Sequence, residues 1–130
     1  MGLRVYLAGS LESGWQDLVI DAVPSARYDD PRSNALLSPK AYTTWNLAAI
    51  RRCDCIFAYL EATNPSGYGL TLEVGYAKAL GKCIILVDEK TIVGSPSARY
   101  FDIIASCADV HVHSLEDGLN FLKQYKRLVY

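Results

Sequence analysis

Two runs of consecutive apolar residues constrain the fold of this chain more than any other feature. Cys55–Leu60 (CIFAYL) and Cys83–Val87 (CIILV) have the length of β-strands and contain no charged side chain. A strand with apolar side chains on both faces has to be covered on both faces, which is typical of parallel sheets flanked by helices. The two runs therefore predict interior strands of a parallel sheet.

The rest of the sequence alternates between strand-length apolar runs and amphipathic stretches of helix length, the pattern of strands joined by crossover helices. The expected strands are Arg4–Ala8, 26–29, Cys55–Leu60, Cys83–Val87 and a short edge strand, Val110–His113. The expected helices are Trp15–Val23, Pro39–Arg52, a third that ends at Leu80, Ser97–Ala108 and Leu115–Val129, and residues 33–38 are expected to form a loop. A chain of 130 residues has the size of one domain. We therefore expect a single-domain α/β fold over residues 1–130, with a doubly wound, Rossmann-like parallel sheet of five strands.

The balance of charges argues against a nucleic-acid polymer as partner. The 13 Lys and Arg residues face 14 Asp and Glu residues, for a formal net charge of -1, and the clustered basic residues that phosphate backbones require are missing. No apolar run approaches the roughly 20 residues of a membrane-spanning helix, so no membrane partner is expected. The four cysteines, Cys53, Cys55, Cys83 and Cys107, fit neither a zinc ribbon nor a disulfide framework. They predict free thiols in a reducing cytoplasm.

Three loops at the carboxyl ends of expected strands are candidates for ligand binding, because open α/β sheets bind ligands there. They span residues 9–14, 29–34 and 62–69. The first (GSLESG) and the third (ATNPSGYG) are rich in Gly and Ser and lead into helices, whose N-termini attract anions. Neither loop carries the Gly-x-Gly-x-x-Gly or Gly-Lys-Ser/Thr fingerprint, so no cofactor is expected.

Glu73 stands out because it lies on an otherwise apolar helix face. Its neighbours three and four positions away are Gly69, Leu70, Tyr76 and Ala77. Two interpretations remain open at this stage. Glu73 is either solvated at the edge of the helix, or it is an ionised carboxylate aimed into the ligand cleft, where the helix dipole helps to keep it charged. The second arrangement suits a nucleophile.

Two further groups of residues also allow more than one interpretation. His111 and His113 share a face of the last expected strand, and they are either surface histidines, which we favour, or a metal-binding pair. We expect no bound metal. The aromatic residues Trp15, Tyr42 and Trp45 are interpreted as core or rim residues, one of which could stack on a base.

Several segments of the chain resemble the nucleoside 2-deoxyribosyltransferase family. They are VYLAGS at residues 5–10, Asp30-Pro31-Arg32, the stretch 45–54 with its Trp45, Asn46, Leu47, Ile50 and Asp54, and NPSGYGLTLEVGYA at residues 64–77, followed by Gly81-Lys82. The most specific part is Gly-x-x-x-Glu-x-Gly-x-Ala around Glu73, and the resemblance covers residues 4–89. It implies a flavodoxin-like fold and an enzyme that cleaves the N-glycosidic bond of a nucleoside or its 5′-monophosphate.

The resemblance also implies roles for individual residues. The residue matching Glu73 is the nucleophile that forms a glycosyl-enzyme intermediate, the one matching Tyr6 orients it, and serines matching Ser10 and Ser66 bind the 5′-phosphate in the hydrolases. The other loop residues that we expect to bind substrate are Gly9, Asp30, Arg32, Asn64, Gly67 and Gly69. The family usually forms dimers or larger assemblies in which a neighbouring subunit completes the site. The aromatic residues Tyr42, Trp45 and Tyr68 suit such an interface, so we expect a homodimer or larger.

The chain departs from the family pattern at two acidic positions. An Asp that contacts the base is replaced by Asn46, which can hydrogen-bond a base but cannot protonate it. A second Asp is replaced by Gly67, and Asp30 could supply an acid in its place. Asn46 remains our third candidate catalytic residue. These losses leave open transfer, hydrolysis, an unusual base, or a non-catalytic nucleotide-binding or sensor domain that has kept the cleft.

Overall fold

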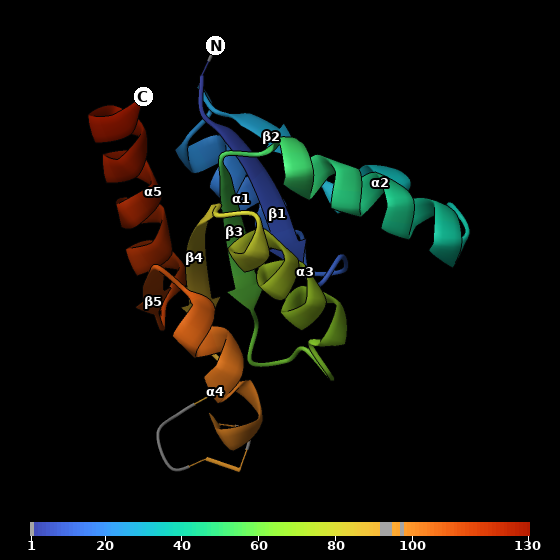
Figure 1. The fold of residues 1–130 in the computed structure, drawn as a ribbon. Coiled ribbons are helices and arrows are strands. Elements are labelled where there is room, and N and C mark those ends of the chain that lie inside the picture. Colours follow the sequence, from blue (N-terminus) through green and yellow to red (C-terminus); the bar gives the residue numbers. More distant parts are fainter. Residues whose placement is uncertain (1, 92–94, 97) are drawn as a thin grey trace.

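The computed structural model describes residues 2–91, 95, 96 and 98–130, and these residues contain one five-stranded parallel sheet (Figure 1). Its strands are β1 (Arg4–Gly9), β2 (Arg27–Asp29), β3 (Cys55–Leu60), β4 (Cys83–Asp88) and β5 (Val110–Val112). The strands lie in the order β2-β1-β3-β4-β5, and every neighbouring pair is parallel. The two apolar runs form β3 and β4, both interior, which confirms the prediction made from them.

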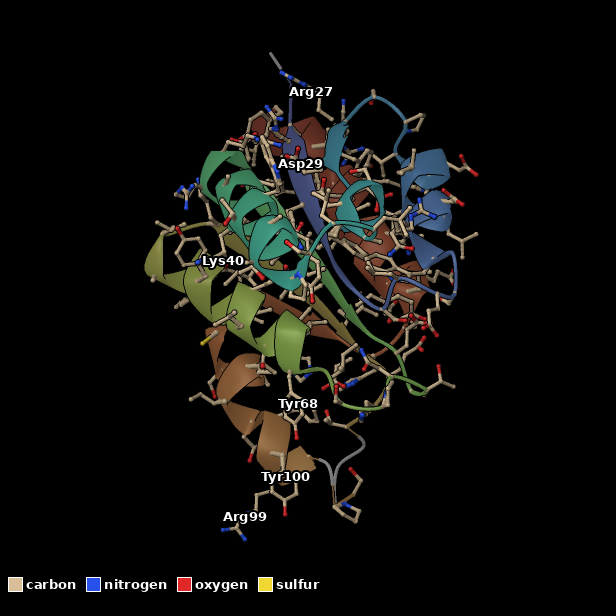
Figure 2. The ribbon with its side chains drawn as sticks, turned by 90° about the vertical axis from the view of Figure 1, so that its right-hand side faces the viewer. Arg27, Asp29, Lys40, Tyr68, Arg99 and Tyr100 are labelled. Carbon is tan, nitrogen blue, oxygen red and sulfur yellow. The ribbon has the colours of Figure 1, made fainter. Side chains whose placement is uncertain are left out.

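Helices cover both faces of the sheet. They are α1 (Trp15–Ala22), α2 (Pro39–Arg52), α3 (Tyr68–Ala79), α4 (Ala98–Cys107) and α5 (Leu115–Val129), together with a short 3₁₀ helix, η1 (Pro31–Asn34). Helices α2, α3 and α4 pack on one face, and α1 and α5 pack on the other, as Figure 2 shows with the sheet between the two layers. The strand order is that of flavodoxin-like domains, so the expected fold class is confirmed.

The boundaries differ from the sequence prediction in a few places. The loop expected over residues 33–38 begins with η1, because the Asp30 side chain accepts a hydrogen bond from the Arg32 N–H and Pro31 occupies the first helical position. Strand β4 continues through Asp88. The fourth helix was expected from Ser97, which lies outside the described residues.

Successive residues of each central strand pack into two hydrophobic clusters, one on each face of the sheet. Ile56 and Leu86 pack under α2, α3 and α4, whereas Phe57 and Val87 pack under α1 and α5. Burial of each such side chain contributes about 1.5–3 kcal/mol to folding. Because neighbouring residues of a strand point to opposite faces, this packing fixes the register of every strand and the face on which Tyr6 lies.

Strands β1 and β3 are neighbours, but the helices that follow them lie on opposite faces. A crevice therefore opens between the carboxyl ends of these two strands. At this point Gly9 has a φ of 153°, and a Cβ atom there would lie 2.6 Å from the Tyr59 carbonyl oxygen. Only glycine allows β1 to run this close to β3 before the chain turns away. The Trp15 indole N–H then donates to the Ser10 carbonyl at 2.8 Å and holds the following loop.

Two expectations about the whole chain can be compared with the structure. All four cysteines are free thiols, as their spacing predicts. Each described helix falls short of the length and hydrophobicity that a bilayer crossing requires.

Candidate active site

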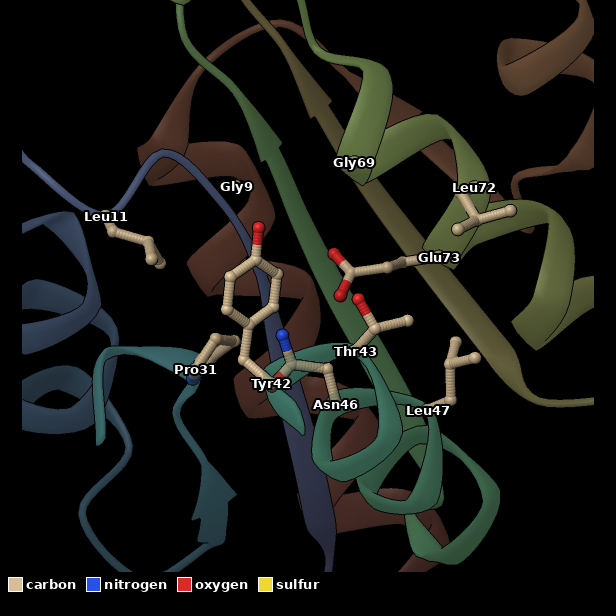
Figure 3. A pocket seen from close by; sticks show the side chains of 10 residues that line it. All are labelled: Gly9, Leu11, Pro31, Tyr42, Thr43, Asn46, Leu47, Gly69, Leu72 and Glu73. Atoms are coloured by element: carbon tan, nitrogen blue, oxygen red, sulfur yellow. The ribbon is translucent and has the colours of Figure 1, made fainter. Parts of the chain in front are cut away.

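The centre of the candidate site is a contact between Tyr6 of β1 and Glu73 of α3. The Tyr6 hydroxyl donates a hydrogen bond to Glu73 Oε2. Tyr6 is 1% exposed, so the surrounding core fixes its ring and directs its hydroxyl toward Glu73. Figure 3 shows the Glu73 carboxylate directed into a pocket toward side chains of α2. The sequence places the two residues 67 positions apart, and the fold brings them together.

Burial changes the acid–base properties of this pair. Removal from water raises the pKa of the Glu73 carboxyl to about 7, and the Tyr6 hydrogen bond lowers it only in part. Burial, together with the neighbouring Glu73 charge, raises the pKa of Tyr6, so Tyr6 remains a donor. Desolvation therefore outweighs the favourable contacts, so the Glu73 carboxyl takes up a proton at a higher pH than an ordinary glutamate. The alternative of a solvated Glu73 fails, since the carboxylate is half-buried and hydrogen-bonded.

Two cavities meet at Glu73. The first, of about 170 Å³, is drawn in Figure 3, and the second, of about 230 Å³, lies on the loop side of Glu73. The first is lined by Gly9, Leu11, Pro31, Tyr42, Thr43, Asn46, Leu47, Gly69, Leu72 and Glu73. The second is lined by Gly9, Ser10, Leu11, Asn64, Ser66, Gly67, Tyr68, Gly69, Leu70 and Glu73. Ligand pockets usually measure about 300–1,000 Å³, so a ligand of ordinary size would occupy both cavities with Glu73 near its middle.

The first cavity has apolar walls and a single amide in a defined orientation. Asn34 Nδ2 donates to Asn46 Oδ1 at 3.3 Å. This contact leaves the Asn46 Nδ2 group to face the pocket, as Figure 3 shows. Position 46 therefore offers hydrogen-bond donors to a ligand, and the surrounding Leu11, Pro31 and Tyr42 offer flat apolar contact.

The second cavity is built from the start of α3 and two loops. The N-cap residue of α3 is Gly67, which has a φ of 79° and no side chain to cap the first N–H groups. Asn64 Oδ1 accepts a hydrogen bond from the Ser66 N–H at 3.1 Å, and the Lys90 ammonium donates to the Asn64 carbonyl. The first N–H groups of α3, which no side chain caps among the described residues, and the hydroxyls of Ser10 and Ser66 thus line the same cavity, which is a suitable environment for an anion.

Two expected binding residues are engaged elsewhere. The Arg32 guanidinium pairs with Asp30 at 2.7 Å and with Asp17 at 2.8 Å. The Asp30 carboxylate also accepts the Arg32 N–H at 3.0 Å as the cap of η1. Asp30 lines a cavity beside Tyr6 and Asn46, but its oxygens are occupied by Arg32. In this structure the two side chains are therefore engaged with each other, and Arg32 also with Asp17.

The sequence alone missed several lining residues. Thr43 and Leu47 of α2 and Leu72 of α3 line the first cavity, and Asp29, which was predicted only as part of the loop over residues 29–34, lines the one beside Tyr6. Because Tyr42, Thr43, Asn46 and Leu47 follow the three- and four-residue spacing of one helix face, that periodicity could have identified Thr43 and Leu47. Asp29 is held by Arg4 and Arg52, each at 2.8 Å, which the sequence could not reveal.

Comparison with known proteins shows the family to which this chain belongs. A search of curated proteins finds no match. Among solved structures, the chain is similar to CMP N-glycosidase BcmB from Clostridium botulinum, with 26% identity, a TM-score of 0.65 and coverage of 94% of this chain and 98% of that one. It also shares its fold with a 2-deoxyribosyltransferase from Leishmania mexicana, with 20% identity, a TM-score of 0.70 and coverage of 95% and 98%. The family model described as nucleoside 2-deoxyribosyltransferase like matches residues 2–91, and the chain belongs to this family.

Proposed function

We propose that this protein hydrolyses the N-glycosidic bond of a nucleoside 5′-monophosphate, with Glu73 as the nucleophile. The observation that carries the proposal is the Tyr6–Glu73 hydrogen bond at the junction of the two cavities. A base in the first cavity and a phosphate in the second would place the sugar, and hence its anomeric carbon, beside this carboxylate.

The chemistry of the reaction matches the properties of Glu73. Glycosidic cleavage passes through an oxocarbenium-like transition state, so an adjacent carboxylate first stabilises positive charge and then bonds to the anomeric carbon. Tyr6 holds Oε2, which leaves Oε1 for the attack. With a pKa of about 7, a large part of Glu73 is ionised at neutral pH. Water then attacks the anomeric carbon, breaks its bond to Glu73 and releases the sugar phosphate, and the proton that this water loses neutralises the departed base.

We assign Asn46 the role of assisting the departure of the base. The leaving base gains negative charge on its ring nitrogens and carbonyl oxygens, and a fixed N–H donor stabilises that charge without transferring a proton. The hydrogen bond from Asn34 orients the Asn46 amide for this purpose. A pyrimidine, with acceptors beside its glycosidic nitrogen, fits such a donor, and the likeness to a CMP N-glycosidase supports this choice.

The second cavity supports a phosphorylated substrate. Away from Glu73, the cavity offers donors to an anion: the N–H groups at the start of α3 and the hydroxyls of Ser10 and Ser66. A 5′-phosphate would receive hydrogen bonds from these groups and would also be stabilised by the helix dipole.

The decisive experiment is a turnover and capture assay. Deoxynucleosides, ribonucleosides and their 5′-monophosphates are incubated with the protein, and free base is measured by chromatography. A 2-fluoro-2-deoxy nucleotide should add the mass of one sugar phosphate to the wild type and nothing to Glu73→Gln. Glu116→Gln, at the exposed start of α5, is the matched control and should still be labelled. Nucleotide binding without turnover of any substrate would favour the sensor domain, and base exchange without hydrolysis would favour a transferase.

We also propose that the protein acts as a homodimer or larger assembly in the cytoplasm. Trp45 and Tyr68 are 55% and 80% exposed, and both line cavities of the site. Tyr100 of α4 is 77% exposed, and Figure 2 shows it at the same end of the molecule as Tyr68. Exposed aromatic residues of this kind are enriched in the cores of protein interfaces. Sedimentation that shows only a 14.4 kDa species at micromolar concentration would contradict the proposal.

A further inference from the structure

A second cluster of reactive side chains lies at the far edge of the sheet, on β4 and β5. Asp88 is the last residue of β4, and His111 and His113 belong to β5 and the position after it. One potential ligand atom from each residue lies within 4.8 Å of the other two. The two imidazole rings are 4.8 Å apart between centroids, so the histidines do share a face of the strand. Asp88 supplies a carboxylate that sequence spacing alone did not associate with them.

The Asp88 carboxylate is held in one position by its neighbours. It is 1% exposed. Its Oδ1 accepts the N–H groups of Lys90 and Thr91 at 3.1 and 2.9 Å, and its Oδ2 accepts the Thr91 hydroxyl. The remaining contact of Oδ2 is with His111 Nε2 at 3.1 Å. A carboxylate fixed by hydrogen bonds, with one oxygen turned to an imidazole, has the form of a metal ligand supported by its surroundings.

The His113 ring is also oriented by a specific partner. Its Nδ1 lies 2.9 Å from the Asp88 carbonyl oxygen. A carbonyl oxygen only accepts hydrogen bonds, so Nδ1 carries a proton and the neutral ring has its lone pair on Nε2. A backbone carbonyl bonded to the far nitrogen is the usual support of a metal-binding histidine.

We propose that Asp88, His111 and His113 form a binding site for a divalent transition-metal ion such as Zn²⁺, with a fourth position left to water. Two imidazoles and a carboxylate are a ligand set that zinc accepts. Ligand atoms about 2.0–2.1 Å from a tetrahedral ion lie roughly 3.3 Å apart. The His111–Asp88 separation of 3.1 Å therefore needs little adjustment, whereas the His113 ring, with a ligand atom within 4.8 Å of the others, has to approach by up to about 1.5 Å. The ion replaces the proton that His111 Nε2 shares with Asp88 Oδ2.

The expected role of this ion is to hold the edge of the sheet. Strand β5 has three residues and pairs only with β4 among the described strands. A metal bound to both strands would act as a cross-link at their carboxyl ends. The proposal concerns binding and does not depend on Glu73 or on turnover, so it can fail or succeed independently of the proposed function.

The test is titration of the metal-free protein with Zn²⁺ and, separately, with Co²⁺ and Mg²⁺. We expect one Zn²⁺ per chain with a dissociation constant below about 10 µM, a rise in melting temperature because the ion binds the folded state, and no comparable effect of Mg²⁺, which prefers oxygen ligands. His111→Ala and His113→Ala should each weaken Zn²⁺ binding by about tenfold or more. Both histidines are exposed, so these variants should fold.

Cysteine thiols are the main competing ligands and provide the control. Cys83 and Cys107 are the partly exposed thiols, and the Cys83→Ser/Cys107→Ser variant should keep the full affinity. The Co²⁺ complex should lack the intense near-ultraviolet band of a thiolate ligand. Unchanged Zn²⁺ affinity in both histidine variants, loss of binding in the cysteine variant, or wild-type binding weaker than about 100 µM would each overturn the proposal.

Discussion

Glu73 and Asp88 are both carboxylates shielded from water, but the protein surrounds them differently. Among the described residues, Tyr6 is the hydrogen-bond donor to Glu73, and burial raises the pKa of this carboxyl to about 7. Asp88 is more deeply buried, yet four groups from Lys90, Thr91 and His111 contact its two oxygens. Desolvation destabilises a charged group unless hydrogen bonds replace the lost water. The contacts of Asp88 therefore favour a stabilising role for it, whereas the Tyr6 hydroxyl engages only Oε2 of Glu73, which is consistent with the proposed role of Glu73 as nucleophile.

The strongest test of this contrast is Glu73→Gln. The amide keeps the shape of the side chain but neither stabilises an oxocarbenium ion nor bonds to it. We expect turnover to fall by about 10³-fold or more, with an unchanged circular dichroism spectrum. Glu116→Gln, on the exposed face of α5, should retain full activity. Turnover of the Glu73→Gln protein near the wild-type rate would exclude Glu73 as the nucleophile.

Removal of the other carboxylate should affect stability. Asp88→Ala leaves the Lys90 and Thr91 N–H groups without their acceptor, and buried unsatisfied donors cost about 1–3 kcal/mol each. We expect a loss of about 3 kcal/mol in the free energy of unfolding, measured by urea denaturation. Asp109→Ala is not a neutral comparison, because Asp109 accepts the Ile84 N–H at 2.8 Å. Asp102→Ala, at an exposed position of α4, is the control. A loss no larger than that of the control would show that the Asp88 contacts do not stabilise the segment of residues 88–91 that follows β4.

The raised pKa of Glu73 also predicts a pH-dependent stability difference. The ordinary value is 4.5 and the folded value about 7, so between these limits the folded state binds more protons than the unfolded state. Stability of the wild type should therefore fall as the pH rises from about 4.5 to 7. Glu73→Gln lacks this loss, so its melting temperature should exceed that of the wild type by a margin that grows over this range and is constant above it. A margin that is independent of pH would contradict the raised pKa.

The smallest expected effect concerns Tyr6. Its hydroxyl lowers the pKa of Glu73, and Tyr6→Phe removes that contribution while the ring stays in the core. The acidic limb of the profile of kcat/KM against pH, expected near pH 7 in the wild type, should move to higher pH. The maximal rate should fall by about tenfold or less, because the nucleophile remains but is less well oriented. A limb that moves to lower pH would mean that another group controls it.

The sequence was sufficient to predict those parts of the molecule that depend on local pattern. The apolar runs of β3 and β4 identified interior strands, and the isolated Glu73 on an apolar helix face indicated a special carboxylate. Side-chain pairing between distant elements was not predictable in this way. That Asp30 pairs with Arg32, and that Asp88 contacts His111, depends on how loops and strands are placed in space. Family resemblance supplied Tyr6, because its buried hydroxyl gives no pattern of its own in the sequence.

The uncapped start of α3 has a consequence for local motion at the site. Helix α5 begins with Ser114, whose hydroxyl accepts the Asp117 N–H at 3.1 Å, whereas Gly67 offers no side chain to the first turn of α3. Because no side chain among the described residues caps this turn, we expect the amides of residues 68–70 to exchange their hydrogens fast. A phosphate held there would serve as the missing cap, so binding should slow exchange in this turn of α3 and leave the first turn of α5 unchanged. The phosphate of the substrate would then stabilise the first turn of α3, the helix that carries the proposed nucleophile Glu73.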